Sequence, residues 1–180
     1  MACDLTRGRL LSCKDQIGGI VRVYFIDYGD LGDVTLVDDE ITTLSGTFSA
    51  YQYDLKGTNS LETTITSSTE NGTTFFEEVL TLSLPKLSKA DNKELKLMAY
   101  GRPHVVVEDR NGNCMMAGLD HGMDVTGGTI ATGTAFGDFA GYTLTLTGME
   151  MTPANFISGA VAGNPFVTAA ANATIVTGTW

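Results

Sequence analysis

The distribution of charge along the chain is the feature that most limits how it folds. The sequence has 180 residues, and all 11 of its Lys and Arg lie at or before Arg110. Residues 111–180 are rich in Gly, Ala and Thr, include the strand-like run 141–150, and carry four acidic residues, Asp120, Asp124, Asp138 and Glu150. An enzyme site is normally built from His, basic and acidic groups at close range. This tract is more typical of a surface that packs against copies of itself.

The overall composition fits one domain spanning residues 1–180, because 43% of the residues are hydrophobic and suffice for a core. Charged residues make up 18%, below the usual quarter. Two interpretations stay open: partners cover much of the surface, or a β-rich protein carries Thr on its wet faces. The net charge of −10 repels a DNA backbone. This excludes a DNA-gripping protein but allows DNA to slide past without adhering.

The cysteines and the start of the chain carry no targeting or cross-linking signal. Cys3, Cys13 and Cys114 form no CxxC pair and are odd in number, so neither a disulfide framework nor a zinc site is predicted. Residues 1–7 lack the apolar core of a signal peptide, and no apolar run approaches the ~20 residues of a membrane span. We expect synthesis in a reducing cytosol and no membrane contact.

Alternation of apolar and polar residues between turn signals predicts a mainly β fold, a β-sandwich or partial β-barrel with one flanking α-helix. Residues 1–19 are interpreted as an N-terminal arm, and 119–140 as a Gly-rich loop or ribbon. Residues 152–171 are expected to be irregular, and 156–180 form an irregular C-terminal segment. A closing strand with Ile175 inside is expected within 172–180. The other expected strands are 20–27, 34–37, 41–44, 47–55, 104–109, 114–117 and 142–151.

A long hairpin is the clearest local signal. Residues 60–69 and 74–84 form its arms, and Asn71-Gly72 between them is favoured in a type I′ turn. Such a hairpin is barely stable alone in water and must lie on a sheet or a neighbouring molecule. Phe75 and Phe76 lie near the tip, where a monomer leaves at least one of them wet. We therefore predict an assembly interface at the tip and arms, formed by Asn71, Gly72, Thr73, Phe75 and Phe76.

One segment is predicted to be helical. Ser88 and Asp91 form a capping pattern before a run of helix formers that reaches Tyr100, and Gly101 and Pro103 end it. The expected apolar face consists of Leu87, Ala90, Leu95 and Met98. A second face carries Lys89, Lys93 and Lys96, which is either solvated or in contact with an acidic patch of a neighbouring subunit.

Residues that carry chemistry are sparse. His104 and His121 lie in no metal-ligand spacing, and His121 has no obvious nucleophile near it. Turn-forming roles are expected for Asp27, Asp30 and Asp33, since no Glu follows at the distance a calcium loop requires. Neither a Walker loop, a dinucleotide fingerprint nor a G-x-S-x-G motif occurs.

The acidic residues also fail to form an obvious catalytic pair. Glu77 and Glu78 are adjacent on a strand and face opposite sides, so they cannot flank one bond. Residues 38–40, Asp-Asp-Glu, are expected in a turn without an apolar pocket to raise a pKa. We therefore expect no enzymatic activity, no cofactor and no metal.

The order of these features resembles that of a known family. A long hairpin (60–84), a helix (88–100), a Val-rich strand, the segment 118–128 and the run Gly-Tyr-Thr-Leu-Thr-Leu-Thr-Gly-Met-Glu before a Pro (141–153) follow one another. This arrangement resembles the tail tube (major tail) proteins of long-tailed bacteriophages. The similarity covers roughly residues 47–155 and is one of pattern and order rather than of an invariant motif.

The resemblance implies a β-sandwich or half-barrel flanked by one helix, located in the virion tail after synthesis in the bacterial cytoplasm. Such proteins usually form stacked hexameric rings whose sheets join into a continuous inner barrel. The resulting tube surrounds a tape-measure protein and conducts double-stranded DNA during genome ejection. The residues themselves agree at two points, because joining sheets removes exposed edge strands and an acidic lumen repels phosphate.

Two alternatives remain open from the sequence. One is a ring protein of the head–tail junction or collar, which would share the fold and the acidic character. The other is a secreted β-sandwich module that binds glycans.

Overall fold

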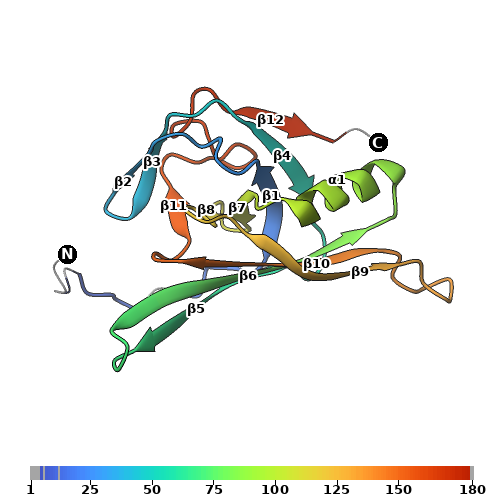
Figure 1. The fold of residues 1–180 in the computed structure, drawn as a ribbon, viewed down its shortest axis with the longest axis horizontal. Helices are drawn as coiled ribbons and strands as arrows, with labels where there is room; N and C mark the ends of the chain where they lie inside the picture. The colour runs from blue at the N-terminus through green and yellow to red at the C-terminus, as the bar shows by residue number, and fades with distance from the viewer. Residues whose placement is uncertain (1–4, 6, 12, 179–180) are drawn as a thin grey trace.

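The fold consists of two packed β-sheets and one short α-helix, which confirms the predicted fold class. The computed structural model describes residues 5, 7–11 and 13–178. In Figure 1 a four-stranded sheet runs along the lower side of the molecule and an eight-stranded sheet lies above it. Both sheets are open, so the arrangement is sandwich-like rather than a closed barrel.

The eight-stranded sheet contains strands from both ends of the chain. They are β1 (Ile20–Ile26), β2 (Val34–Val37), β3 (Glu40–Leu44), β4 (Ser49–Asp54), β7 (His104–Asp109), β8 (Cys114–Ala117), β11 (Asn155–Ile157) and β12 (Thr174–Thr177). Their order across the sheet is β12-β4-β1-β7-β8-β11-β3-β2. The pairings β12–β4 and β11–β3 are parallel, and the others are antiparallel.

The four-stranded sheet contains the long hairpin. Its strands are β5 (Ser60–Ser68), β6 (Thr73–Pro85), β9 (Asp124–Ala131) and β10 (Gly141–Glu150), and their order is β5-β6-β10-β9. All three pairings are antiparallel, and β6 and β10 are in register over ten residue pairs. The expected hairpin and the expected strand over 142–151 are therefore confirmed.

Two apolar cores lie on the two faces of the eight-stranded sheet. Successive residues of β1 alternate between them, because side chains of a strand point to opposite faces. Val23 and Phe25 join Leu80, Leu82 and Leu146 in the core between the two sheets. The other core contains Tyr24, Ile26, Val106, Met116, Phe166 and Ala169. The C-terminal segment, although mostly irregular, thus covers one face of the eight-stranded sheet.

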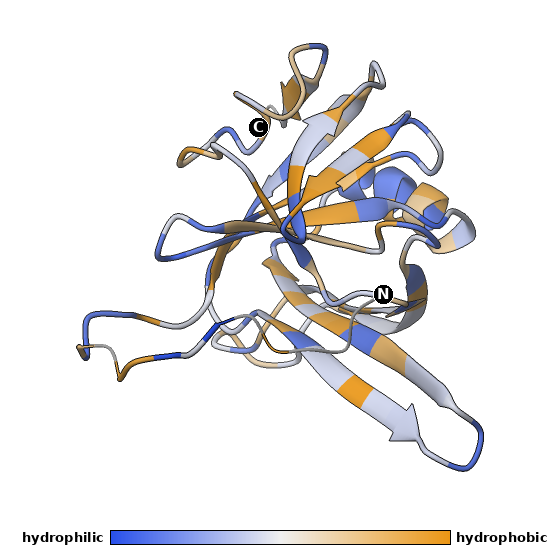
Figure 2. Ribbon diagram, turned by 90° about the vertical axis from the view of Figure 1, so that its left-hand side faces the viewer, coloured by the Kyte–Doolittle hydropathy of each residue, from blue (hydrophilic) through white to orange (hydrophobic). Residues whose placement is uncertain are grey.

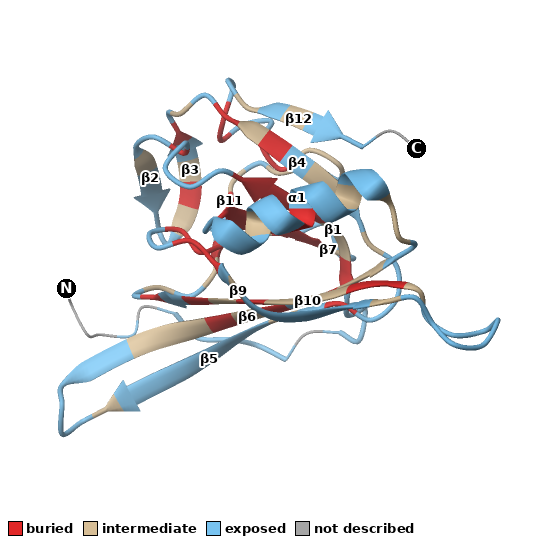
Figure 3. Ribbon diagram, turned by 45° about the vertical axis from the view of Figure 1, so that its right-hand side comes forward, coloured by how far each residue is buried: buried red, intermediate tan, exposed pale blue. Residues whose placement is uncertain are grey.

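The helix α1 (Lys89–Tyr100) begins as predicted. The Oγ of Ser88 accepts the N–H of Asp91 at 3.0 Å, and the Ser88 hydroxyl donates to the Asp91 carboxylate at 2.6 Å. Leu95 is buried, Met98 packs on the core between the sheets, and Figure 3 shows α1 between the two sheets. Gly101 ends the helix with extended backbone rather than a left-handed cap.

One residue of the predicted apolar helix face is misplaced. Ala90 is exposed, whereas Asp91 occupies that part of the inner face because its side chain and backbone bond to Ser88. The three lysines Lys89, Lys93 and Lys96 are exposed.

The predicted turn at the hairpin tip is wrong in type. Ser68 pairs with Thr73, so the loop has four residues, and Gly72 alone within it has a positive φ, of 63°. A type I′ turn needs positive φ at both central residues. The Ser68 hydroxyl accepts the N–H of Asn71 at 3.3 Å and so favours the wider loop. Two consecutive residues with positive φ occur instead at Asp38 and Asp39, between β2 and β3, with φ of 53° and 61°.

One segment expected to be a loop or ribbon and one expected to be irregular both contain strands. The Gly-rich segment 119–140 includes β9, which pairs along β10 as an edge strand. The segment 152–171 includes β11, which bridges β8 and β3. The closing strand is confirmed as β12, where Ile175 packs partly buried on the core. Cys3 and Trp180 lie outside the described residues.

Candidate functional site

The outward face of the four-stranded sheet is polar and carries no basic residue. Along β10 the inward Leu144 and Leu146 alternate with Thr143, Thr145 and Thr147, which face away from the core. The charged residues of the four strands are all acidic: Glu62, Glu77, Glu78, Asp124 and Glu150. Since the register places opposed residues on one face, this face is a Thr-rich surface of negative charge.

Three of these carboxylates lie on the outward face. Glu62 is opposite Val79, which is opposite Thr147, which is opposite Asp124, so one row crosses the whole sheet with a carboxylate at either end. Glu77 lies two residues from Val79 along β6 and therefore shares this face. Glu78 and Glu150 face inward and are buried.

Both edges of this sheet are open. Within the described part of the chain, β5 pairs with β6 alone and β9 pairs with β10 alone. An open edge presents a row of backbone N–H and C=O groups that another strand can pair with. The sheet can therefore be extended at either side by a second chain.

The hairpin extends beyond the sandwich, and the predicted interface residues gather there. Figure 3 shows its end as exposed ribbon at one end of the molecule. Asn71, Gly72 and Thr73 are exposed at the tip, and Phe75 and Phe76 are partly exposed. Ile65, opposite Phe76, is 67% exposed although it lies on the inward-facing side. Contact of this tip with another copy stays a prediction.

A second projecting loop, residues 132–140, carries an aromatic residue that sequence reasoning missed. Phe136 is fully exposed. The Asp138 carboxylate accepts the N–H of Thr134 at 2.8 Å and of Ala135 at 2.7 Å, and these bonds lower the pKa of Asp138. Figure 1 shows this loop at the end of the molecule opposite the hairpin tip. The loop is thus held by its own hydrogen bonds while it presents Phe136 to water.

Two buried carboxylates tie the loop 118–123 to the four-stranded sheet. Glu150 accepts the backbone N–H of Asp120 at 3.1 Å and that of His121 at 2.8 Å. Its carboxylate also bonds to the ring Nδ1 of His121 at 2.9 Å. Glu78 accepts the N–H of Gly118 at 2.8 Å. Burial raises the pKa of Glu78 to about 7, the Gly118 bond opposes this, and the charge of Glu150 adds to it.

His104 ties the same loop to the eight-stranded sheet. Its Nε2 accepts the N–H of Gly29 at 3.2 Å, so its Nδ1 carries the proton and donates to the Gly118 carbonyl at 2.6 Å. Burial lowers the pKa of His104 and keeps the ring neutral. Tyr28 stacks on this ring at 5.1 Å, and the Arg102 guanidinium lies 4.7 Å from the Tyr28 ring centre.

These groups connect the loop 118–123 to both sheets through hydrogen bonds. Glu78 and His104 are buried, and their bonds go to backbone groups: both bond to Gly118, and His104 also accepts the N–H of Gly29. The exposed His121 bonds to Glu150, which raises the pKa of His121. Sequence reasoning missed this cluster, although Glu78 alternates with Leu80 and Leu82 on the inward side of β6, which indicates a buried carboxylate that needs partners.

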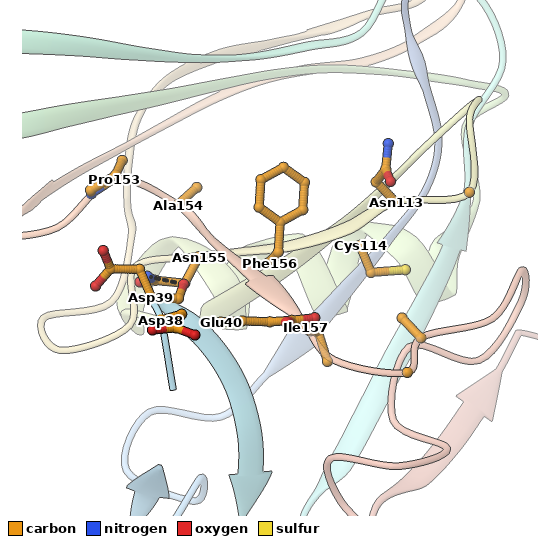
Figure 4. Close-up of a pocket in the computed structure, with 13 residues that line it drawn as sticks. Asp38, Asp39, Glu40, Asn113, Cys114, Pro153, Ala154, Asn155, Phe156 and Ile157 are labelled. Atoms are coloured by element: carbon orange, nitrogen blue, oxygen red, sulfur yellow. Dashed lines mark hydrogen bonds between the residues drawn. The ribbon is translucent and has the colours of Figure 1, made fainter. Parts of the chain in front are cut away.

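The acidic turn at residues 38–40 lies beside a cavity, contrary to the expectation of a turn without an apolar pocket. The cavity has a volume of about 550 Å³ and is bordered by all three acidic residues. Figure 4 shows the Phe156 ring between Ala154 and Asn113, with Asp38 and Asp39 grouped to one side. The reason is non-local, because β11 places Phe156 opposite Glu40.

Asp27, Asp30 and Asp33, for which turn-forming roles are predicted, lie in the turns that follow β1. The Asp30 N–H bonds to the Asp27 carbonyl, and the Asp33 N–H bonds to the Ser45 hydroxyl. Among the described residues, no group of three or more His, Cys, Asp or Glu is placed to hold a metal ion. Within that same part of the chain, no helix has the length and apolar character needed to cross a membrane.

Comparison of the chain with protein-family models, with curated proteins and with solved structures gave no match in any of the three.

Proposed function

We propose that the chain is a phage virion structural protein that assembles into stacked rings and forms the tail tube through which DNA is ejected. The observation that carries the proposal is the four-stranded sheet, which has two long open edges and an outward face whose charges are all acidic. The proposal is supported by the order of elements that resembles tail tube proteins, and by these two properties of the sheet.

Edge-to-edge joining explains why both edges are open. If β5 of one copy pairs with β9 of the next, each copy adds four strands to a shared barrel. Six copies would give a barrel of about 24 strands, wide enough to leave a channel. The concave side of that barrel would be the Thr-rich face, since the other face of the sheet is buried in the core between the sheets.

The charge of this face suits the passage of DNA. Glu62, Glu77 and Asp124 would line the channel without a Lys or Arg among the strand residues. Like charge repels phosphate, so the duplex would not adhere to the wall. The tape-measure protein would occupy the same channel before ejection.

Negative-stain electron microscopy of the purified full-length chain tests the proposal. We expect hollow polymers that lengthen with protein concentration. Discrete rings that never stack would favour a head–tail junction protein instead. A monomer at every concentration would overturn assembly altogether and favour the glycan-binding module.

A polymer alone does not place the acidic face in the channel. A cryo-EM map of the polymer should show the four-stranded sheets joined through β5 and β9 around the axis. A map in which this face lies on the outside of the polymer would contradict the proposed channel.

A further inference from the structure

The N-terminal arm carries highly exposed apolar side chains together with basic residues. Leu10 and Leu11 are fully exposed, and Arg7, Arg9 and Lys14 lie beside them in sequence. Exposure of a leucine to water is unfavourable, whereas an arginine is well hydrated. The segment has the composition of a ligand for a surface that is apolar in the middle and acidic at its rim.

The cavity beside residues 38–40 is such a surface. Its apolar part includes Pro153, Ala154 and Phe156, a residue that is 51% exposed (Figure 4). Asp38 and Asp39 are exposed at its border, and no hydrogen bond or ion pair from another described residue reaches their carboxylates. Two unpaired acids therefore border an apolar floor.

The root of the arm lies next to this cavity. The N–H of Ile17 donates to the Asn111 side chain at 3.0 Å, and that side chain donates back to the Ile17 carbonyl at 2.9 Å. The next two residues, Gly112 and Asn113, line the cavity. Figure 2 shows the chain near the N-terminus making an excursion to the left of the body. An extended chain from Ile17 to Leu10 reaches roughly 20 Å from this root.

We propose that the arm of one copy docks in the cavity of a second copy of this chain. Leu10 and Leu11 would cover Phe156 and Ala154, and Arg7 and Arg9 would pair with Asp38 and Asp39. Each copy offers both an arm and a cavity, so the contact can pass from copy to copy around a ring. The inference rests on the self-association that the proposed function requires, but not on a tube.

Photo-crosslinking in the full-length chain tests this docking. A benzoylphenylalanine replaces Leu10, and ¹⁵N-labelled and unlabelled proteins are mixed before irradiation. Mass spectrometry then locates the crosslinks. We expect mixed heavy–light peptides that join position 10 to residues 38–40 or 153–156. The same probe in place of the exposed Lys93 on α1 should give no crosslink to these residues.

A charge-neutralising pair sharpens the test. Asp38→Asn with Asp39→Asn keeps the positive φ, which Asn tolerates, and removes both charges. Loss of two exposed ion pairs should reduce the crosslink yield about threefold to tenfold. The matched pair Asp30→Asn with Asp33→Asn, on another exposed turn, should leave the yield unchanged.

Three results would overturn the docking: crosslinks within single chains, crosslinks to other surfaces of the second copy, or a yield that Asp38→Asn with Asp39→Asn does not change. The readout is separate from that of the proposed function. Crosslinks at the cavity without hollow polymers would support the docking and contradict the proposed tube. Hollow polymers without these crosslinks would support the tube and contradict the docking.

Discussion

The two sheets differ in how completely their faces are covered. The eight-stranded sheet has an apolar core on each face, one shared with the four-stranded sheet and one closed by the C-terminal segment. The four-stranded sheet has a core on one face and a Thr-rich acidic surface on the other. Burial on both faces gives the first sheet most of the apolar stabilisation. The second leaves a whole face and its edges available for another molecule.

The edges of the two sheets show the same contrast. The eight-stranded sheet ends in β12 and β2, which have four residues each. The four-stranded sheet ends in β5 and β9, which have nine and eight residues. Short edge strands limit unwanted pairing between sheets, whereas long ones invite it. The chain thus protects the edges of one sheet and leaves long edges on the other.

The largest expected effect on the free energy of unfolding distinguishes the buried C-terminal segment from the projecting loop 132–140. Phe166 is buried and packs edge-on against Tyr24 and Phe48, with ring centres 6.2 and 5.3 Å away. Phe166→Ala should lower the free energy of unfolding by about 3–5 kcal/mol, measured by chemical denaturation. Phe136→Ala, which truncates an exposed ring, should change it by less than about 0.5 kcal/mol. Equal effects would show that the irregular segment does not belong to the core.

The next largest effect is a pH dependence of stability that distinguishes the inward Glu78 of β6 from the outward Glu77. Glu78 has its pKa raised from 4.5 to about 7, so the folded state prefers the protonated carboxyl. The contribution of the protonated Glu78 carboxyl to the stability of the folded state is fully present below the ordinary pKa of 4.5. This contribution is lost as the pH rises through about 7. Glu78→Gln mimics the protonated form and can still accept the Gly118 N–H.

The expected result is a stability difference that depends on pH. Between about pH 4 and about pH 8, the variant should gain about 3 kcal/mol relative to the natural chain. His104, His121 and Glu150 are present in both proteins, so their own titration largely cancels. Glu77→Gln, on the outward face, is the matched control and should show no such trend. Parallel stability curves for Glu78→Gln and the natural chain would contradict the buried, protonated carboxyl.

The parts of the fold that sequence reasoning predicted are those with local signals. Ser88 and Asp91 mark the helix start because their bond spans one helical turn. Alternation in β10 predicts a half-buried strand because each face repeats every second residue. Asn71-Gly72 located the hairpin but not its turn type, because the Ser68 hydroxyl bonds to the N–H of Asn71 and only Gly72 has a positive φ.

The parts that were missed depend on contacts between distant residues. β11 has three residues, too few for a periodic pattern, and exists because β8 and β3 both pair with it. The cluster of Glu78 and Glu150 around the loop 118–123 arises from the β6–β10 register, which the sequence does not display. The cavity beside residues 38–40 is equally non-local, since its apolar wall follows from the placement of β11.

A shortened hairpin tests whether assembly and stability are separate properties. Replacing residues 65–76 by Asn-Gly leaves Thr64 opposite Glu77 and supplies a two-residue turn. Because the removed residues pair with one another, apart from Phe76 opposite Glu150, stability should change by about 1 kcal/mol or less. Polymers should disappear in electron micrographs and in sedimentation, while circular dichroism stays that of a folded β protein. Normal polymers from this variant would exclude the predicted interface at the tip.

The smallest expected effect on stability tests what the outward face does. Thr145 lies at the centre of this face, between Thr81 and the side-chain-free Gly127, so Thr145→Lys has room. Its free energy of unfolding should change by less than about 0.5 kcal/mol, and polymers should still form. If this face lines the proposed channel, a ring of lysines there should retain double-stranded DNA, with affinity that falls as salt rises. Thr35→Lys, on the edge strand β2, should add the same charge without that retention. Equal retention by both variants, or by neither, would mean that this face does not line a DNA channel.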